Sequence, residues 1–394
     1  MRILRSCGLL GCLVKMLPWS VAGLIRSTSR ILPDNPQVGL GRIAVLTVCG
    51  LASLSAADGA EFAIPPKFED VGTFHEGVAP AKLQGQWGLV DRSGNWIVPP
   101  SYDQIRRGNL GRFAVLKNKR WGFVTSLGKR IAEPQYDDVS GFRNGLAAVK
   151  RGSRWGYLGI DGRAAMPMQF DVATPPENGV ATVKKDGQWG YVRVDGTFTA
   201  MQDTGGEVLS LSEFTNGFAI RGYKGSEDFY CLSLSETCTN VAQRSFKRVR
   251  RFSENFAAVQ VLESAKWSYL RADGALLFVD RFEEADDFSQ GFAAVRSNGK
   301  WGYINQRGTF VVEPRYDAAY SFRDGYAVIR QGQARGFLGL TENGSITIAI
   351  PPQYEDVYGV AEGMAGAKSG GKWGFLALGT PPKIVRGVVD LASP

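Results

Sequence analysis

Few side chains in this sequence have the types and spacing that enzyme chemistry requires. The chain of 394 residues contains a single histidine, His75, so a histidine-based metal site or a Ser-His-Asp triad cannot readily be assembled. The sequence has no glycine-rich phosphate loop and no nucleophile motif. Adjacent acids such as Asp137 and Asp138 fall in a predicted loop without an assigned partner. We therefore expect no enzyme activity, no cofactor and no metal ion, and keep a glycan hydrolase that uses scattered acids as the alternative.

The charge of the chain is unevenly distributed. The net charge of +8 comes from 46 basic and 38 acidic residues, but six of the basic residues and one acid lie in residues 1–57. The remaining 40 basic and 37 acidic residues give a net charge of +3, which does not indicate a nucleic-acid partner. Hydrophobic residues make up 44% of the chain, which predicts a folded core.

Residues 1–57 have the features of a leader that ends in an export signal. Ile43 to Leu54 is an apolar run with Arg42 before it, and it is shorter than the roughly 20 residues of a membrane span. Small residues predict cleavage after Ala57, and a translation start at Val38 would give a signal of ordinary length over residues 38–57. We expect a periplasmic or secreted bacterial protein. A cytoplasmic protein with an apolar tail and a retained membrane anchor are the alternatives.

A Trp-Gly pair recurs along the rest of the sequence. Four consecutive pairs are 34 residues apart, and Trp267-Ser268 and Arg335-Gly336 lie in phase with a further pair. Phe229-Tyr230 fills the remaining gap, which makes nine copies over residues 63–380 and leaves a tail, residues 381–394. The copies at 229, 267 and 335 are degenerate, and we expect the middle and eighth copies to be weak points or adapted to a ligand. The repeat residues are Trp87, Gly88, Trp121, Gly122, Trp155, Gly156, Trp189, Gly190, Trp267, Trp301, Gly302, Trp373 and Gly374.

Each copy is predicted to be an all-β unit. In the copy from Gly291 to Asp317, Phe292 to Arg296 and Trp301 to Asn305 flank a hairpin turn, and a third strand from Thr309 ends at Pro314. The Trp packs on one face of its strand, and the Gly leaves the other face bare for a neighbouring copy. A single copy is too small to bury a core, so the copies must stack.

These motifs as a set resemble the WG-repeat family of bacterial proteins. Besides the Trp-Gly pairs, the chain has Gly-x-Ala-x-Val strands such as Gly145 to Val149, and a proline followed by an aromatic residue and an acid, as in Pro134 to Asp137. The resemblance covers about residues 63–380. It implies a binding or scaffolding role and brings no established activity and no catalytic residue.

The two ends of the repeat region have nearly matching sequences. Ile64 to Val71 is similar to Ile350 to Val357, so the region begins on a third strand and ends after two strands around Trp373. First and last copies could complete one unit and close a propeller-like ring. Because nine copies exceed the common four to eight blades, and three strands fall short of four, we expect an open, curved β-solenoid, with the closed ring as the alternative.

Aromatic and basic side chains are the candidates for binding. Tyr102, Tyr136, Tyr316 and Tyr354, each followed by an acid, form a candidate ligand surface for sugars, although acids that accept backbone N–H bonds and lock a turn explain the recurrence better. Basic clusters near the first turn of several copies would suit an acidic envelope polymer, with solvated turns as the simpler interpretation. Acids of the following copy are expected to neutralise the strongest cluster, Arg244 to Arg251.

Two cysteines remain once the leader is set aside. Aligning Phe229 with Trp155 places Cys231 and Cys238 on the two arms of one hairpin. This predicts a disulfide that contributes about 2 kcal/mol, and two free buried thiols are the alternative.

The sequence as a whole predicts a non-catalytic, exported and monomeric repeat protein. It would offer a binding or scaffold surface to a protein or cell-envelope partner. A carbohydrate-binding module and an intracellular scaffold are the alternatives. We expect no nucleic-acid partner, and a membrane contact only if the leader is uncleaved.

Overall fold

The computed structural model describes residues 61–379 except residues 107, 202–207, 213–214, 232–240 and 242–243, and it leaves out the side chains of residues 230 and 231. The described residues all fall within one compact unit of the chain. The predicted leader, the predicted tail and Cys238 lie outside the described residues. A search of the described residues finds no helix with the length and apolarity that crossing a membrane requires.

Nine small antiparallel sheets, called blades 1 to 9, follow one another along the described chain. Each blade begins with a strand of two residues and continues with a hairpin of two long strands, and in eight blades a last strand completes the sheet. In blade order, the two-residue strands are β2 (Asp70–Val71), β6 (Gln104–Ile105), β10 (Asp138–Val139), β14 (Val172–Ala173), β18 (Ser210–Leu211), β21 (Arg248–Val249), β25 (Glu284–Ala285), β29 (Ala318–Ala319) and β33 (Asp356–Val357).

The long strands keep the same order in every blade. The first of them are β3 (Val78–Leu83), β7 (Arg112–Lys117), β11 (Leu146–Arg151), β15 (Val180–Lys185), β19 (Phe218–Tyr223), β22 (Phe256–Gln260), β26 (Phe292–Ser297), β30 (Tyr326–Gln331) and β34 (Met364–Ser369). The second are β4 (Gln86–Asp91), β8 (Arg120–Thr125), β12 (Arg154–Gly159), β16 (Gln188–Arg193), β20 (Ser226–Cys231), β23 (Trp267–Arg271), β27 (Lys300–Asn305), β31 (Ala334–Leu340) and β35 (Lys372–Ala377). The last are β5 (Trp96–Tyr102), β9 (Arg130–Tyr136), β13 (Ala164–Phe170), β17 (Phe198–Ala200), β24 (Leu276–Phe282), β28 (Phe310–Tyr316), β32 (Ile346–Tyr354) and, for blade 9, β1 (Phe62–Phe68).

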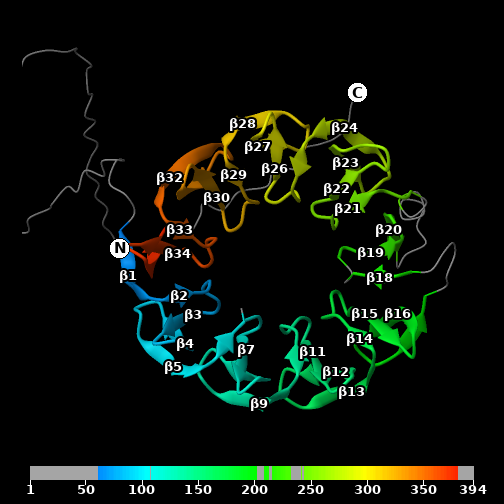
Figure 1. The fold of residues 1–394 in the computed structure, drawn as a ribbon, viewed down its shortest axis with the longest axis vertical. Coiled ribbons are helices and arrows are strands. Elements are labelled where there is room, and N and C mark those ends of the chain that lie inside the picture. Colours follow the sequence, from blue (N-terminus) through cyan, green and yellow to red (C-terminus); the bar gives the residue numbers. More distant parts are fainter. Residues whose placement is uncertain are drawn as a thin grey trace, which may run out of the picture. The chain divides into compact units, whose positions relative to one another are not determined.

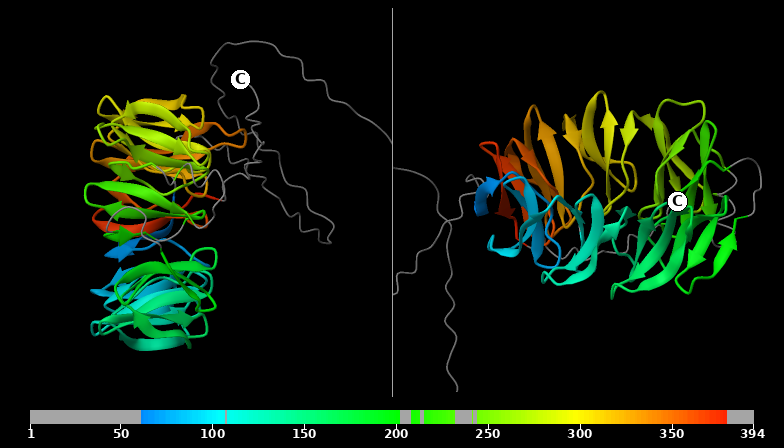
Figure 2. Two further views of the ribbon diagram at one scale, coloured as in Figure 1. Left: turned by 90° about the vertical axis from the view of Figure 1, so that its right-hand side faces the viewer. Right: turned by 60° about the horizontal axis from the view of Figure 1, so that its bottom comes forward.

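The blades form a closed ring, with the two-residue strands on its inner side and the last strands on its outer side (Figure 1). Figure 2 shows the same ring from two further directions. The ring closes because β1 pairs with β35, Phe62 opposite Leu376 and Phe68 opposite Trp373. The expected open, curved β-solenoid is therefore wrong, and the closed propeller-like ring, the stated alternative, is the fold. The two-residue strand supplies the fourth strand that the sequence interpretation lacked.

The interface that closes the ring resembles those between consecutive blades. Within the ring, the Glu254 carboxylate of blade 6 accepts a hydrogen bond from the Gly291 N–H of blade 7 at 2.8 Å. At the closure, the Glu362 carboxylate of blade 9 accepts one from the Gly77 N–H of blade 1 at 3.0 Å. Phe68 and Trp373 lie in one core cluster with Val71 and Phe74 of blade 1. Closure therefore buries apolar surface that an open ribbon would expose.

The segment that connects consecutive copies was predicted to be a loop, but it contains the two-residue strand, and a tight turn explains why. In blade 3, Asn144 and Gly145 have φ of 45° and 81°, and Arg143 bridges to Leu146 across them. Two central residues with positive φ are characteristic of the type I′ hairpin turn, for which Asn-Gly is the favoured pair. The chain thus reverses a few residues after the short strand, and the short strand pairs with the first long strand.

The glycine of the Trp-Gly pair lies beneath a bulge in the last strand of its own blade. In blade 7 the register of β27 and β28 shifts around this point, and a Cβ on Gly302 would lie 2.4 Å from the Val312 carbonyl oxygen. The strand that approaches belongs to the same blade, not to a neighbouring copy as expected. Pro314 does not end the strand either. It lies in the bulge, where no ladder N–H is needed, and β28 continues to Tyr316.

Adjacent blades share cores and a recurring hydrogen bond. One core cluster contains Tyr303 of blade 7 together with Phe322 and Leu338 of blade 8, which agrees with the expectation that copies must stack. A buried tyrosine two residues after the Trp donates its hydroxyl to a carbonyl of the next blade in three places. These bonds are Tyr157 to Thr174 at 2.8 Å, Tyr269 to Asp286 at 2.7 Å and Tyr303 to Tyr320 at 2.7 Å.

Blade 5 departs furthest from the repeat. Its register pairs Gly222 with Glu227 and Arg221 with Asp228, so Glu227 and Asp228 take the places that Trp and Gly take in the other blades. The alignment of Phe229 with the tryptophans is wrong by two residues, because hairpin register, not aromatic character, determines equivalence. Arg221 and Asp228 form a buried ion pair at 2.8 Å, each side chain 9% exposed.

Blade 6 tolerates a side chain at the glycine position. Ser268 is fully buried, and its hydroxyl accepts a hydrogen bond from the Asp280 N–H at 2.8 Å. In the same strand, Phe278 and Asp280 have φ of 51° and 49°, in the left-handed region. The last strand of this blade therefore follows a different path that accommodates the Ser268 side chain.

Candidate binding cleft

The four candidate tyrosines are core residues of their blades. Tyr102, Tyr136, Tyr316 and Tyr354 are between 3% and 8% exposed. A sugar that stacks on an aromatic residue needs an accessible ring face, so these rings do not provide the expected ligand surface. The structure corrects this interpretation because each tyrosine pairs across its blade with the residue at the Trp position and is covered there.

The acids that follow these tyrosines lock hairpin turns. Each carboxylate accepts a backbone N–H from the turn between the two long strands of the next blade, which was the preferred explanation from sequence. The pairs are Asp103 with Asn118 at 2.8 Å, Asp137 with Gly152 at 2.7 Å, Asp317 with Gly332 at 2.6 Å and Glu355 with Gly371 at 3.1 Å.

Several of the basic residues have partners within the ring. Arg154 forms an ion pair with Asp171 at 2.7 Å. In the strongest cluster, Arg250 pairs with Asp286 at 3.2 Å, and Arg251 pairs with Asp287 at 3.2 Å. Acids of the following blade thus neutralise two arginines of this cluster, as expected. The disulfide stays a prediction, because Cys238 lies outside the described residues.

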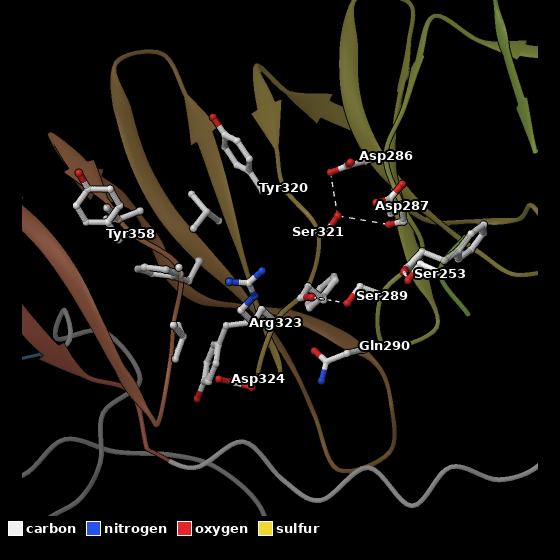
Figure 3. A pocket seen from close by; sticks show the side chains of 18 of the residues that line it. Ser253, Asp286, Asp287, Ser289, Gln290, Tyr320, Ser321, Arg323, Asp324 and Tyr358 are labelled. Carbon is white, nitrogen blue, oxygen red and sulfur yellow. Dashed lines mark hydrogen bonds between the residues drawn. The ribbon is translucent and has the colours of Figure 1, made fainter. Parts of the chain in front are cut away.

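A cleft of about 760 Å³ lies where the segments after the short strands of blades 7, 8 and 9 meet. It is lined by residues 286–290, 320–324 and 356–360 of these segments, with Arg251 and Ser253 from blade 6 at one end. Figure 3 shows side chains from these segments directed into one space. The volume falls in the range of pockets that bind ligands, about 300–1,000 Å³.

A degenerate repeat residue accounts for part of the cleft. In three blades of the described chain the residue that follows the short strand packs on the ring of the Trp, as Arg250 does on Trp267 in blade 6 at 5.4 Å. In blade 2 Arg106 lies 3.9 Å from the Trp121 ring, and in blade 9 Tyr358 stacks on Trp373 at 4.6 Å. In blade 8 the Trp position holds Arg335, which lines the cleft and pairs with Asp356. Arg335 has no aromatic ring, so Tyr320, which follows the short strand of blade 8, has no indole at the position where Trp373 packs on Tyr358.

Two tyrosines expose their rings beside this space. Tyr320 and Tyr358 occupy equivalent positions of blades 8 and 9 and are 51% and 38% exposed. Burial and the neighbouring Asp70 raise the pKa of Tyr358 to about 12, so its hydroxyl stays a hydrogen-bond donor at neutral pH. The Tyr358 ring stacks on Trp373, and its hydroxyl donates to Asp70 at 3.3 Å, so only the remaining exposed part of this ring lines the cleft beside the half-exposed Tyr320. Partly exposed tyrosine rings are enriched in protein interfaces. The sequence analysis did not identify either tyrosine as a binding residue. The replacement of the repeat Trp by Arg335 is the feature of the sequence that could have indicated a site in this blade.

Paired charges line the far side of the cleft. The Ser321 hydroxyl donates to Asp286 at 2.8 Å, and Asp287 is held by Arg251. Burial, followed by the adjacent charge of Asp286, raises the pKa of Asp287 above its ordinary value. The described residues contain no group of three or more acids, histidines or cysteines arranged to hold a metal ion. The cleft is thus suited to binding through aromatic and charged contacts.

The ring of nine blades places this protein among the β-propellers. A family model described as WG containing repeat matches residues 60–87, 87–121, 121–155, 155–189, 281–301, 301–333 and 347–373. These segments cover more than half of the sequence, so the chain belongs to the WG containing repeat family. The search of curated proteins returned no match to the chain.

Solved structures with a similar fold share little sequence with this chain. The crystal structure of a eukaryotic initiation factor is 12% identical with a TM-score of 0.51, and the match covers 75% of this chain and 92% of that chain. The structure of Hsv2p of Kluyveromyces lactis is 12% identical with a TM-score of 0.39, covering 62% and 96%. At such identities the first of these similarities shows the fold alone.

Proposed function

We propose that this protein is a non-catalytic binding protein that holds a partner protein in the cleft on blades 6 to 9. The repeat fold and the family are consistent with a binding or scaffold role. The observation that carries the proposal is the pair of exposed rings, Tyr320 and Tyr358, beside the position where Arg335 replaces the repeat Trp. Rigid blades hold these rings in place, so their side chains lose little conformational freedom on binding.

We also propose that the protein acts outside the cytoplasm, on the basis of the apolar run and small residues that end at Ala57. A mature N-terminus at Asp58 in protein isolated from its native cell would support export. A mature chain that retains Met1 would contradict it.

A comparison of variants tests the binding site. The partner is isolated by cross-linking and affinity capture from the native cell, and its affinity is then measured for the wild type and for Tyr320→Ala with Tyr358→Ala. We expect at least a tenfold loss, because exposed aromatic residues at the centre of an interface commonly contribute more than 1 kcal/mol each.

The control is Leu127→Ala, which removes an 87% exposed side chain of blade 2, outside the cleft. Both proteins should unfold at the temperature of the wild type. An unchanged affinity of the double variant, or an equal loss in the Leu127→Ala control, would contradict the assignment of the cleft.

A further inference from the structure

The cleft contains an arginine, Arg323, at a position where the equivalent arginine of another blade forms an ion pair with an acid. In blade 3, Arg143 lies just before the inner turn and pairs at 3.5 Å with Glu177 at the equivalent position of blade 4. Arg323 occupies this position in blade 8, and its equivalent in blade 9 is Ala361. The alanine has no carboxylate to offer. Among the described residues, no acid forms an ion pair with Arg323.

Two of the acids that line the cleft with Arg323 are paired with other arginines. Asp287 pairs with Arg251, and Asp356 pairs with Arg335. Figure 3 shows Arg323 near the middle of the cleft, between Tyr358 on one side and Asp287 on the other. The guanidinium is exposed, and its planar set of five N–H donors matches a carboxylate in a bidentate geometry.

We infer that the cleft binds an extended peptide segment of a partner protein, and that Arg323 holds a single carboxylate of that segment. The carboxylate is an Asp or Glu side chain or the C-terminal group, and apolar or aromatic peptide residues contact Tyr320 and Tyr358. This inference rests on the proposed function, since it names the chemistry that the same cleft recognises.

The shape of the surface favours an extended ligand. A second cavity, of about 390 Å³, is lined by Ser212 and Thr215 of blade 5 and shares Arg251 and Asp287 with the cleft. The two spaces therefore share this ion pair in their linings. A peptide of several residues can reach from one space to the other, whereas a compact small molecule would occupy only one of them.

The acids of the cleft favour a peptide over an acidic polysaccharide. Asp286, Asp287, Asp324 and Asp356 all line the cleft around Arg323. A polymer with a negative charge on every sugar would place several charges against these carboxylates, and like charges in close contact are strongly unfavourable. A peptide needs to place only one carboxylate at Arg323 and can present neutral or basic residues to the acids.

Selection followed by charge removal tests the inference. Random peptides displayed on phage, with free C-termini, are selected on the purified full protein. Each selected peptide is synthesised in two forms, one unchanged and one that lacks a single carboxylate. The carboxylate is removed by replacing Asp with Asn or Glu with Gln, or by amidating the C-terminus. Fluorescence anisotropy then gives the affinity of each. We expect removal of one carboxylate to weaken binding about 10- to 100-fold, as for a charge-assisted bidentate hydrogen bond.

Variants of the protein complete the double-mutant cycle. Arg323→Ala should weaken the carboxylate peptide by a similar factor and should not weaken the neutral peptide further. Arg323→Lys should give an intermediate loss, because the charge is kept and the planar fork is lost. Arg307→Ala, which removes an exposed arginine outside the cleft, is the matched control and should leave the affinity unchanged.

Each contrary outcome has a distinct meaning. If the Tyr320→Ala and Tyr358→Ala variants lose binding but carboxylate removal has no effect, the proposed function stands and the role of Arg323 is wrong. If peptides bind independently of both tyrosines and Arg323, or if none is selected, the inference is overturned. An oligogalacturonate that binds in an Arg323-dependent manner, where no peptide does, would replace the peptide with an acidic glycan.

Discussion

At the scale of single residues, the Trp-Gly pair combines two physical requirements. The Trp packs against the core of the blade, and the Gly allows the last strand to cross within van der Waals contact of the second long strand. Close approach is visible at Gly302, where an added Cβ would meet backbone atoms of Val312 and Pro314 below 3 Å. Those atoms belong to a strand fixed by its own pairing, so the strand cannot move away easily.

The Gly302→Ala substitution should therefore destabilise the protein by about 1–3 kcal/mol through overpacking. Thermal and denaturant unfolding measure this change. The control is Gly141→Ala, since no atom lies within 4 Å of a Cβ added at Gly141 and its φ is not in the left-handed region. A Gly302→Ala variant as stable as the wild type would show that the bulge is not a steric requirement.

At the scale of elements, hairpins and repeat phase were predictable, but the short strands were not predicted. The 34-residue spacing correctly located the two long strands of most blades. The Asn-Gly pairs at Asn144, Asn178 and Asn216 are hairpin signals that would have predicted the first turn, had they been used. The path of the last strand across Gly302 could not be predicted, because periodicity does not show a bulge.

The acids that lock the turns predict a dependence of stability on pH. The Lys300 ammonium and then the Gly332 N–H lower the pKa of Asp317, and hydrogen bonds at turns likewise lower the pKa of Asp91 and Asp195. A carboxyl whose pKa is lower in the folded state stabilises the fold above its unfolded pKa of about 3.9. This stabilisation is lost as the pH falls through the lower folded value.

Unfolding midpoints measured from pH 6 to pH 2 should therefore fall below about pH 4. The Asp317→Asn variant should be less stable near neutral pH and should lose less stability on acidification than the wild type. Glu342→Gln, at an exposed acid before β32, serves as control and should follow the wild-type profile. If the unfolding midpoints of Asp317→Asn and the wild type changed with pH in parallel, the role of Asp317 in stabilising the turn would be refuted.

At the scale of the whole molecule, the pairing of β1 with β35 closes the ring. The matching ends of the repeat region indicated that the first and last copies could combine into one blade. Known propellers commonly have four-stranded blades and no more than eight of them, and for this reason the sequence analysis favoured the open form. The short strands remove the first objection. The proximity of Tyr320, Arg323 and Tyr358 could not be predicted, because it depends on how successive blades rotate about the ring.

The closed ring can be tested directly by a disulfide between its first and last strands. Phe62 and Leu376 are register partners of β1 and β35, and antiparallel partners lie about 4.5–5.5 Å apart, within the range that a disulfide bridges. The Phe62→Cys, Leu376→Cys double variant is oxidised and its linked peptides are identified by mass spectrometry. The control pair is Phe62→Cys, Val192→Cys. Val192 faces the last strand of blade 4 in the same way that Leu376 faces β1. We predict a 62–376 link within monomers and no 62–192 link. Absence of the 62–376 link from monomers, or its formation only between molecules, would contradict the closed ring.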